Sequence, residues 1–460
     1  MNPPATIEDI ARAVGAECSA VSARTVDGVS TDTRTLRPGD VFVALRGERF
    51  DGHRFIGAAA EAGAAAVVAE ESVELPADCP TVLLRVDDTL FALQRMALWH
   101  RKRLGLVAIG ITGSNGKTST KDFTAAVLEE AFRVTATRGN FNNHIGLPLS
   151  VLAATAEDQA AVWEMGMNHA GEIAPLCQIA RPKIGVITNI GTAHIEFLGS
   201  VEGIAEEKSA LARALPAEGT LVMPAGCEFF EYFRQRTKAK LLPVGNGRGV
   251  VRAEHIRFEN GGARFRLAID GDDPAEVALS VDGRHMINNA LLAAGVGMTL
   301  GLDAATIAHG LAKTKLAGGR LTRFRRRGVE IIDDSYNANP ESMTAAIETL
   351  AESPLPNGGC KIAVLGHMGE LGAFAEEAHR KIGRFAAGCG VRVAAVGEAA
   401  HAIADGAAEA GGLAEFFPGR DTAAEWLASA AASGDMVLFK GSRSAGIEKV
   451  LETAFPEDTD

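Results

Sequence analysis

The sequence predicts an α/β protein with three domains: a central P-loop-type parallel sheet, a small N-terminal α/β domain and a Rossmann-like C-terminal domain. Short apolar runs rich in β-branched residues alternate with helical stretches from residue 105 onwards, as in parallel sheets covered by helices. A glycine turn at residues 113–116 separates one such run from a helix. At 460 residues the chain is too long for one hydrophobic core. We therefore expect domains at residues 1–86, 87–314 and 315–460.

The N-terminal domain is predicted from short apolar runs separated by polar loops. Thr6 to Asp9 has the pattern of a helix start, with acids in the first turn. A second helix is expected at residues 88–103, leading into the central domain. The strand candidates are residues 41–45, 65–69 and 82–86.

The central and C-terminal domains are predicted from strands that alternate with helices. A glycine-rich linker at residues 315–320 separates them. Residues 250–281 differ, because apolar and polar positions alternate around a turn at 260–262; this predicts an antiparallel hairpin inserted at an edge. The strand candidates are residues 106–112, 161–165, 184–188 and 220–223, then 329–333, 361–365, 392–396 and 436–440.

The turn after residue 112 predicts a phosphate-binding loop. A strand, a glycine turn and a helix N-terminus together direct backbone N–H groups and the positive end of the helix dipole at one point. Lys117 adds a positive charge, and the Thr118 hydroxyl can ligate Mg²⁺. The common P-loop pattern has glycine where this chain has Ile111, but a plain turn would not explain Lys-Thr after the glycines. The predicted loop comprises Gly113, Ser114, Asn115, Gly116, Lys117, Thr118 and Ser119.

Glu164 and His194 end two other strands of the same predicted sheet, where ligands of α/β proteins bind. A carboxylate at the end of an apolar strand is costly unless it holds a cation or a hydrogen bond. Thr118, Glu164 and His194 would form an oxygen-rich Mg²⁺ site. Two other interpretations remain open: a structural salt bridge for Glu164 and a capping or hydrogen-bonding role for His194.

Three further groups of polar residues follow the loop in sequence. Lys208 lies in a predicted helix, and the pattern alone indicates a solvated charge. The polar segment 333–340 ends a strand of the third domain and favours a ligand role. The arginines of residues 320–327 are interpreted as a solvated hairpin face, with Arg320 available to hold a phosphate.

The net charge of −12 excludes bulk attraction to nucleic acid or to an anionic membrane. No apolar run is long enough to span a membrane, and the N-terminus lacks the pattern of a signal peptide. Six scattered cysteines indicate free, buried thiols in a reducing compartment. We expect a cytoplasmic monomer.

The longer motifs, in this order, resemble those of the Mur ligase family over essentially the whole chain. The family resemblance is carried by Thr112-Gly-Ser-Asn-Gly-Lys-Thr118, Glu164, Thr188-Asn-Ile-Gly-Thr-Ala-His194, Lys208, His285 with Asn289-Ala-Leu-Leu-Ala-Ala294, and Gly319-Arg320. Sharper motifs are similar to those of members that join D-alanyl-D-alanine to UDP-N-acetylmuramoyl-tripeptide. These are Ser30-Thr-Asp-Thr-Arg34, Gly139-Asn-Phe-Asn-Asn-His-Ile-Gly-Leu-Pro148, Trp163-Glu-Met-Gly-Met-Asn-His-Ala-Gly-Glu-Ile173, Asp334-Ser-Tyr-Asn-Ala-Asn-Pro340 and Lys440-Gly-Ser-Arg-Ser-Ala-Gly446.

The resemblance implies an N-terminal domain for the UDP-muramoyl-peptide, a central ATPase and a C-terminal domain that closes over the nucleotide. It implies ATP and Mg²⁺ as cofactors, formation of an acyl phosphate with release of ADP, and a carbamate on Lys208, as in several family members. Its catalytic residues would be Lys117, Glu164, His194, Lys208 and Arg320. Nucleotide contacts would add Asn289, Asp334, Tyr336 and Asn337 to the loop. Substrate contacts would be Ser30, Thr31, Arg46, Gly47, Asn142, Asn143 and His144.

The chain departs from the family pattern at Met286, His367 and His144. Two alternatives also remain open. A sister ligase, such as folylpolyglutamate synthetase or another Mur ligase, would share the central domain and use a different amine. A non-catalytic nucleotide-binding switch would need fewer polar groups at the strand ends than this chain carries.

Overall fold

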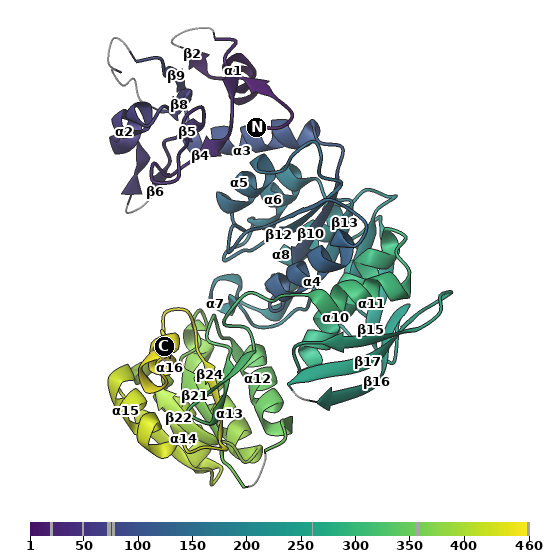
Figure 1. Ribbon diagram of the computed structural model, residues 1–460, viewed down its shortest axis with the longest axis vertical. Helices are drawn as coiled ribbons and strands as arrows, with labels where there is room; N and C mark the ends of the chain where they lie inside the picture. The colour runs from purple at the N-terminus through teal and green to yellow at the C-terminus, as the bar shows by residue number, and fades with distance from the viewer. Residues whose placement is uncertain are drawn as a thin grey trace.

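A computed structural model describes residues 1–18, 22–47, 50–70, 75, 79–259, 261–355 and 358–457. Its three large sheets belong to α/β units that follow one another along the long axis of the molecule, from the purple N-terminal unit to the yellow-green C-terminal unit (Figure 1). The predicted fold class is confirmed.

The N-terminal unit contains a five-stranded sheet. Its strands are mostly parallel, and only β2 runs antiparallel to its neighbour. All three predicted strands are present, with slightly shorter bounds. In spatial order the strands are β2 (Glu17–Cys18), β9 (Val82–Arg85), β8 (Ala66–Ala69), β5 (Val41–Val43) and β4 (Val29–Ser30). Beside the sheet lie α1 (Ile7–Val14), α2 (Ile56–Glu61) and the short pairs β1 (Ala5–Thr6) with β3 (Thr25–Val26) and β6 (Arg46–Gly47) with β7 (Phe50–Asp51).

The predicted helix start near residue 6 is confirmed. Thr6 is the N-cap of α1; its hydroxyl accepts the N–H of Asp9 at 3.1 Å, and the Asp9 carboxylate accepts the N–H of Thr6. This reciprocal cap satisfies two backbone donors that the first helical turn leaves free.

The central unit contains a nine-stranded sheet. In spatial order its strands are β11 (Val134–Ala136), β12 (Ala160–Glu164), β10 (Val107–Thr112), β13 (Ile184–Ile187), β14 (Thr220–Pro224), β15 (Lys240–Asn246), β16 (Val251–Glu259), β17 (Gly262–Ile269) and β18 (Ala275–Leu279). Its helices are α3 (Thr89–Lys102), α4 (Lys117–Glu129), α5 (Gly146–Leu152), α6 (Ile173–Ala180), α7 (Ile195–Leu198), α8 (Val201–Ala214), α9 (Phe230–Arg234), α10 (Arg284–Thr299) and α11 (Ala304–Lys313).

The strand order of the central sheet determines where its ligand site lies. β10 pairs in parallel with β12 on one side and with β13 on the other. The chain therefore leaves β10 where the order of strands reverses, and open α/β sheets bind ligands at the carboxyl end of such a point. The glycine turn after Thr112 lies there. The last strands, β16 to β18, pair antiparallel at the sheet edge, which confirms the predicted edge hairpin; Asn260 in its turn lies outside the described residues.

The C-terminal unit contains a six-stranded sheet that confirms the four predicted parallel strands. In spatial order its strands are β19 (Thr322–Arg326), β20 (Val329–Asp333), β24 (Met436–Lys440), β21 (Lys361–Gly366), β22 (Arg392–Val396) and β23 (Ala414–Phe417). The helices are α12 (Pro340–Glu352), α13 (Ala375–Gly388), α14 (His401–Glu409), α15 (Arg420–Ala430) and α16 (Glu448–Ala454). The sequence did not indicate β23, whose residues are only half-buried at an edge.

The interpretation of the arginine-rich hairpin as a solvated face is right for Arg325 and Arg327, which are exposed, and wrong for Arg323. β19 and β20 do form an antiparallel pair. However, the Arg323 side chain is only 13% exposed and forms ion pairs with Asp282 and Glu330. Because Asp282 belongs to the central unit, this arginine joins two units and is not solvated.

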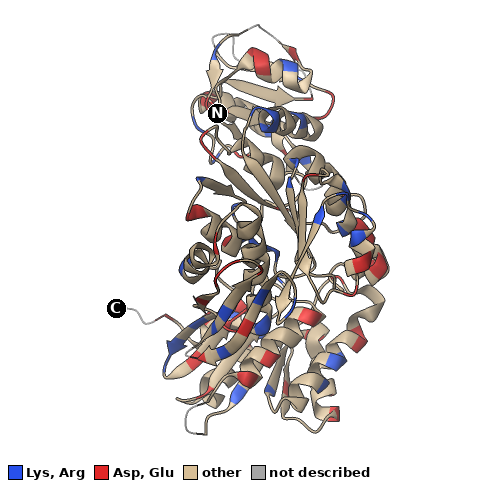
Figure 2. Ribbon diagram, turned by 90° about the vertical axis from the view of Figure 1, so that its right-hand side faces the viewer, with Lys and Arg blue, Asp and Glu red and all other residues tan. Residues whose placement is uncertain are grey.

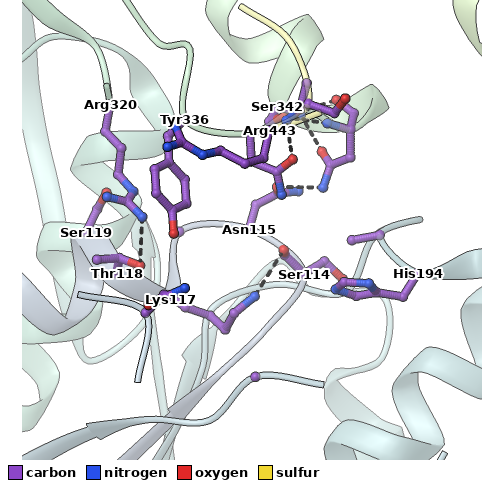
Figure 3. A pocket seen from close by; sticks show the side chains of 18 of the residues that line it. Ser114, Asn115, Lys117, Thr118, Ser119, His194, Arg320, Tyr336, Ser342 and Arg443 are labelled. Atoms are coloured by element: carbon purple, nitrogen blue, oxygen red, sulfur yellow. Dashed lines mark hydrogen bonds between the residues drawn. The ribbon is translucent and has the colours of Figure 1, made fainter. Parts of the chain in front are cut away.

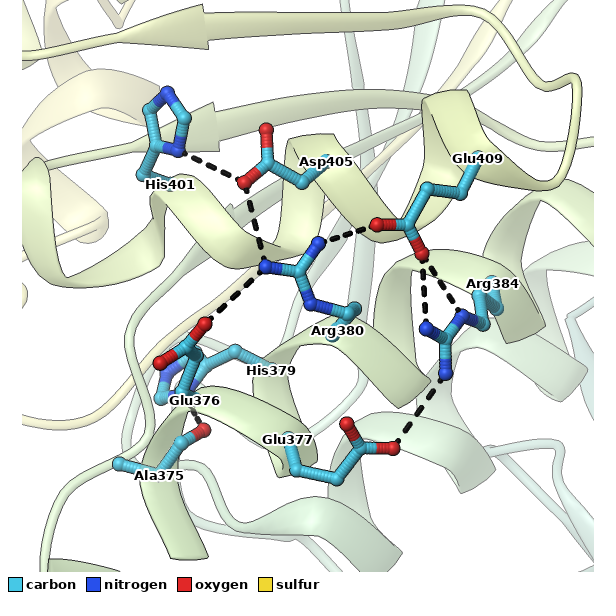
Figure 4. A network of polar contacts seen from close by, with 9 residues as sticks. All are labelled: Ala375, Glu376, Glu377, His379, Arg380, Arg384, His401, Asp405 and Glu409. Carbon is cyan, nitrogen blue, oxygen red and sulfur yellow. Dashed lines mark hydrogen bonds and ion pairs between the residues drawn. The ribbon is translucent and has the colours of Figure 1, made fainter. Parts of the chain in front are cut away.

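Basic and acidic residues are interspersed along the helices of the C-terminal unit (Figure 2). At the contact between α13 and α14, Arg380 pairs with Glu376, Asp405 and Glu409 (Figure 4). Such partly exposed pairs contribute little to stability individually; here they bridge the two helices.

Two expectations concern the chain as a whole. All six cysteines are free, as predicted, but the expectation that they are buried holds only for Cys177. Cys18 and Cys360 are exposed, and Cys79, Cys227 and Cys389 are half-buried. No helix in the described ranges has the length and apolar character needed to cross a membrane.

Candidate active site

The turn between β10 and α4 is built on glycines that have no room for a side chain. Gly116 has φ +76°, in the left-handed region, and a Cβ there would lie 2.5 Å from the Asn289 Oδ1. A Cβ on Gly113 would lie 1.8 Å from the Thr188 hydroxyl oxygen. The turn is therefore packed tightly between β13 and α10, and only glycine fits.

The backbone of the turn is held by the segment after β13. The Ser114 N–H donates to the Asn189 carbonyl at 3.1 Å, and the Asn115 N–H donates to the Asn189 side-chain oxygen at 2.8 Å. The strand-end motif 188–194 thus fixes the shape of the loop.

A cavity of about 980 Å³ lies over this loop and is lined by both the central and the C-terminal unit (Figure 3). It brings together most of the predicted site residues. Those that line it are Ser114, Asn115, Gly116, Lys117, Thr118, Ser119, Asn142, Asn143, His144, Glu164, His194, Asn289, Arg320, Asp334, Tyr336 and Asn337.

The remaining predicted residues do not line this cavity. Gly113 belongs to the same turn, and Lys208 is buried in α8. Ser30, Thr31, Arg46 and Gly47 lie in the N-terminal unit, where Ser30 bonds to the turn at Asp32 and Arg46 pairs with Asp51 and Glu70. The predicted substrate residues therefore fall into two separate groups.

Thr118 and Glu164 meet at the floor of the cavity. The Thr118 hydroxyl donates to Glu164 Oε2 at 2.8 Å, and the Asn142 amide donates to Glu164 Oε1 at 2.8 Å. Glu164 is only 2% exposed, and in the described part of the chain these direct partners are neutral, so the structure does not support a salt bridge as its role. A buried carboxylate beside a hydroxyl, at a phosphate loop, is a donor set that suits Mg²⁺.

Lys117 reaches back over the loop that precedes it. Its ammonium donates to the Gly113 carbonyl at 2.8 Å and to the Ser114 carbonyl at 3.4 Å. Burial lowers the pKa of Lys117, while the Glu164 carboxylate opposes that shift. The lysine is thus held where an anion in the loop would meet its charge.

Lys208 contradicts the expectation of a solvated charge. It lies on the inward face of α8 and is only 1% exposed. Burial, together with the charge of Lys117, lowers the pKa of Lys208 well below its ordinary value. A lysine in such surroundings favours the neutral amine, which is nucleophilic.

His194 is held from the C-terminal unit. Its Nδ1 is paired with the Glu370 carboxylate, so the two residues link α7 to the loop after β21. His194 and Glu164 line the same cavity, but the imidazole contacts Glu370 instead of the Thr118–Glu164 pair. The hydrogen-bonding role that the sequence left open for His194 is therefore present.

The C-terminal unit contributes a second cluster. Lys440 donates to the Asp334 carboxylate at 2.5 Å, and burial raises the pKa of Asp334 despite that lysine. Arg320 lies over the Tyr336 ring, 4.0 Å from its centroid, and donates to the Thr118 hydroxyl at 3.1 Å. Arg320 thus reaches from the interdomain linker to the phosphate loop.

Two residues that line the cavity, Glu341 and Glu370, were not indicated by the sequence. Four others lay in the quoted motifs without a role of their own: His285, Asn339, Lys440 and Arg443. Glu341 directly follows the Asn-Pro helix start at 339–340, a signal that could have indicated it. Among the departures from the family pattern, Met286 accepts a weak contact from the Asn289 amide at 3.8 Å, and His367 pairs with Ser444 at 2.9 Å.

A phosphate loop at a sheet's switch point, shared with groups from a second α/β unit, is typical of nucleotide-dependent enzymes, and we place the chain in that class. Three family models match the chain over most of its length. Residues 25–99 match "Mur ligase family, catalytic domain", residues 111–297 match "Mur ligase middle domain", and residues 319–443 match "Mur ligase, glutamate ligase domain". The chain belongs to the Mur ligase family.

Individual relatives cover almost the whole chain. The UDP-N-acetylmuramoyl-tripeptide–D-alanyl-D-alanine ligase of Escherichia coli is 38% identical over 435 residues, which are 93% of each chain. A crystal structure of MurF from Acinetobacter baumannii superposes with a TM-score of 0.90 at 31% identity, covering 98% of both chains. The MurF ligase of Thermotoga maritima in complex with ADP superposes with a TM-score of 0.82 at 31% identity, covering 93% of this chain and 97% of that one.

Proposed function

We propose that this chain is an ATP-dependent, ADP-forming ligase that joins D-alanyl-D-alanine to UDP-N-acetylmuramoyl-tripeptide in peptidoglycan precursor synthesis. One structural observation carries the proposal: a phosphate loop whose Thr118 hydroxyl contacts the buried Glu164, in a cavity completed by the C-terminal unit. The choice of substrates rests on the named relatives, of which the ligase of Escherichia coli is 38% identical.

In this reaction the terminal carboxylate of the tripeptide attacks the γ-phosphorus of ATP, and ADP leaves as an acyl phosphate forms. The amine of D-alanyl-D-alanine then attacks the acyl carbon, and inorganic phosphate leaves as the amide bond forms. In the first step the negatively charged carboxylate must approach the negatively charged γ-phosphate. Lys117 and Arg320, which both lie at the loop, offset that repulsion. The amine must lose a proton, and His194, beside Glu370, is our candidate acceptor.

Thr118 and Glu164 fit the role of Mg²⁺ ligands, because their oxygens are adjacent and the carboxylate is buried. A bound Mg²⁺ would neutralise charge on the phosphates. We keep His194 as a third candidate ligand. We also propose that Lys208 carries a carbamate, since its surroundings favour the neutral amine that reacts with CO₂.

Other assignments complete the proposal. Asn289 would contact adenine, Asp334, Tyr336 and Asn337 the nucleotide, and Asn142, Asn143 and His144 the peptide. Ser30, Thr31, Arg46 and Gly47 would bind the UDP end. We retain residues 1–86, 87–314 and 315–460 as the three domains, and we propose a cytoplasmic monomer; these points stay predictions.

The decisive experiment measures phosphate release from ATP with UDP-N-acetylmuramoyl-tripeptide, with and without D-alanyl-D-alanine. We expect sustained release and the pentapeptide product only when both are present. Stimulation by a different amine would indicate a sister ligase. ATP binding without any ligated product would indicate a nucleotide-binding switch.

A further inference from the structure

The first turn of α12 contacts the phosphate loop and its support at two points. Asn339, the N-cap of α12, donates a 2.7 Å hydrogen bond from its amide to the Asn115 Oδ1 in the loop. The Glu341 carboxylate accepts the Thr192 N–H at 2.8 Å and the Thr192 hydroxyl at 3.2 Å. One turn of the C-terminal unit thus holds two segments of the central unit.

Thr192 belongs to the segment that shapes the loop. Its neighbour Gly191 donates a 2.9 Å hydrogen bond to the Ser114 hydroxyl, which in turn donates to the Gly191 carbonyl at 3.3 Å. A Cβ on Gly191 would lie 2.9 Å from the carboxyl carbon of Glu341, so the carboxylate lies directly against this backbone. His194 follows two residues after Thr192. A displacement of Glu341 would therefore reach both the loop and His194.

We propose that Glu341 is a positioning residue for the ligase reaction, acting through Thr192 to hold the phosphate loop and His194 in their working arrangement while the C-terminal unit is docked. The proposal deepens the proposed function and rests on it for the identity of the reaction.

The chemistry of the site favours hydrogen bonding as the role of Glu341. Its carboxylate lies in the first turn of a 13-residue helix, where a negative charge is favoured by the dipole. Hydrogen bonds to a carboxylate are stronger than those between neutral groups. Both carboxylate oxygens are already bonded to Thr192, although the residue lines the cavity. Each oxygen keeps a further lone pair, so direct ligation of substrate or metal is the alternative role that the variants below must separate.

Three variants separate these roles. Glu341→Ala removes both bonds. Glu341→Gln retains them in a neutral form, because its amide oxygen accepts the Thr192 N–H and its NH₂ donates to the Thr192 hydroxyl. Glu348→Ala is the matched control, since Glu348 is exposed on the same helix. A fourth variant, Asn339→Ser, keeps a good N-cap but is too short to reach Asn115.

The full chain is assayed for kcat and for the KM values of ATP and UDP-tripeptide, together with the melting temperature. ATP affinity without the second substrate is measured by calorimetry. We expect Glu341→Ala to reduce kcat/KM for ATP by about tenfold, the value of a hydrogen bond to a charged group. The KM for UDP-tripeptide and the melting temperature should change little. Glu341→Gln should stay within about threefold of the parent, Glu348→Ala should match it, and Asn339→Ser should impair the same ATP parameter.

Two results would overturn the proposal: a Glu341→Ala enzyme with unchanged kcat/KM for ATP, or a Glu341→Gln enzyme as impaired as Glu341→Ala. The second result would indicate direct ligation of substrate or metal. Calorimetry measures ATP binding without the ligation reaction, so it tests the positioning role even if the proposed reaction is wrong. If the parent protein produced no ligated product, a loss of ATP affinity confined to Glu341→Ala and Asn339→Ser would still support the positioning role, and unchanged affinity would refute it.

Discussion

The Thr118 hydroxyl donates a 2.8 Å hydrogen bond to the Glu164 carboxylate, joining the first turn of α4 to the end of β12. These residues lie 46 positions apart, yet the parallel pairing of β10 and β12 brings them together at one edge of the sheet. The pair connects the phosphate loop with a buried negative charge, and the first prediction tests that charge.

Glu164→Gln should reduce turnover by about a hundredfold or more. The substitution removes the negative charge that would hold a cation beside the phosphate oxygens, where negative charge develops during the transfer. The glutamine can still bond Thr118 and Asn142, so the fold should be retained. Steady-state phosphate release at increasing Mg²⁺ concentration measures the effect, with Thr118→Ser, which keeps the hydroxyl, as the control. Near-normal turnover of Glu164→Gln would rule out the metal assignment.

Lys208 should carry a carbamate, because burial lowers its pKa and favours the neutral amine. Incubation with ¹³C-bicarbonate should give a carbamate carbon signal in NMR spectra of the parent protein and none in Lys208→Arg. Removal of CO₂ should lower activity, and added bicarbonate should restore it. An active enzyme whose Lys208 remains an unmodified amine at saturating bicarbonate would refute this prediction.

His285 should make the protein less stable in acid. Burial, with a contribution from Lys440, lowers the pKa of His285 to about 4, from an ordinary value of 6.5. The unfolded chain therefore binds the proton more readily between these values. The stability that His285 contributes is complete above pH 6.5 and is lost as the pH falls towards about 4. Melting temperatures from pH 7 to pH 4 should fall less steeply for His285→Gln. Parallel curves for the two proteins would contradict the prediction.

Arg323 should stabilise the docking of the C-terminal unit on the central unit. It is 13% exposed and pairs with Asp282, whose pKa is raised by burial despite the arginine. Arg323→Ala leaves that carboxylate buried without its partner and should cost about 3 kcal/mol in urea unfolding. Arg325→Ala, at an exposed position of the same strand, should cost less than about 0.5 kcal/mol. Equal losses in the two variants would show that the Asp282 contact has no special role.

The strand, turn and helix around residues 113–116 could be predicted because their signals are local. Strand, glycine turn and Lys117 follow one another in sequence, and each residue type has a direct physical role there. Glu164 could be predicted from the cost of a carboxylate at the end of an apolar strand. The strands of the parallel sheets were equally accessible, because each is a short apolar run with clear limits.

Contacts between units could not be predicted, because they depend on how the domains are arranged in space. Glu341 and Thr192 are 149 residues apart, and Asn339 and Asn115 are 224 apart. Lys208 was misjudged because a lysine was taken to be solvated by default, although Ile204 and Leu211, four residues before it and three after it, place it on the apolar face of α8. Arg323 was misjudged for a different reason: the partner that buries it, Asp282, belongs to the other unit.

The account depends on attack of a substrate carboxylate on the γ-phosphate of ATP, and an isotope experiment tests this directly. UDP-N-acetylmuramoyl-tripeptide labelled with ¹⁸O in its terminal carboxylate is converted with ATP and D-alanyl-D-alanine, and the released phosphate is analysed by mass spectrometry. If an acyl phosphate forms, one carboxylate oxygen leaves with the phosphate, so each released phosphate should carry one ¹⁸O. Unlabelled phosphate accompanying the amide product would contradict the account.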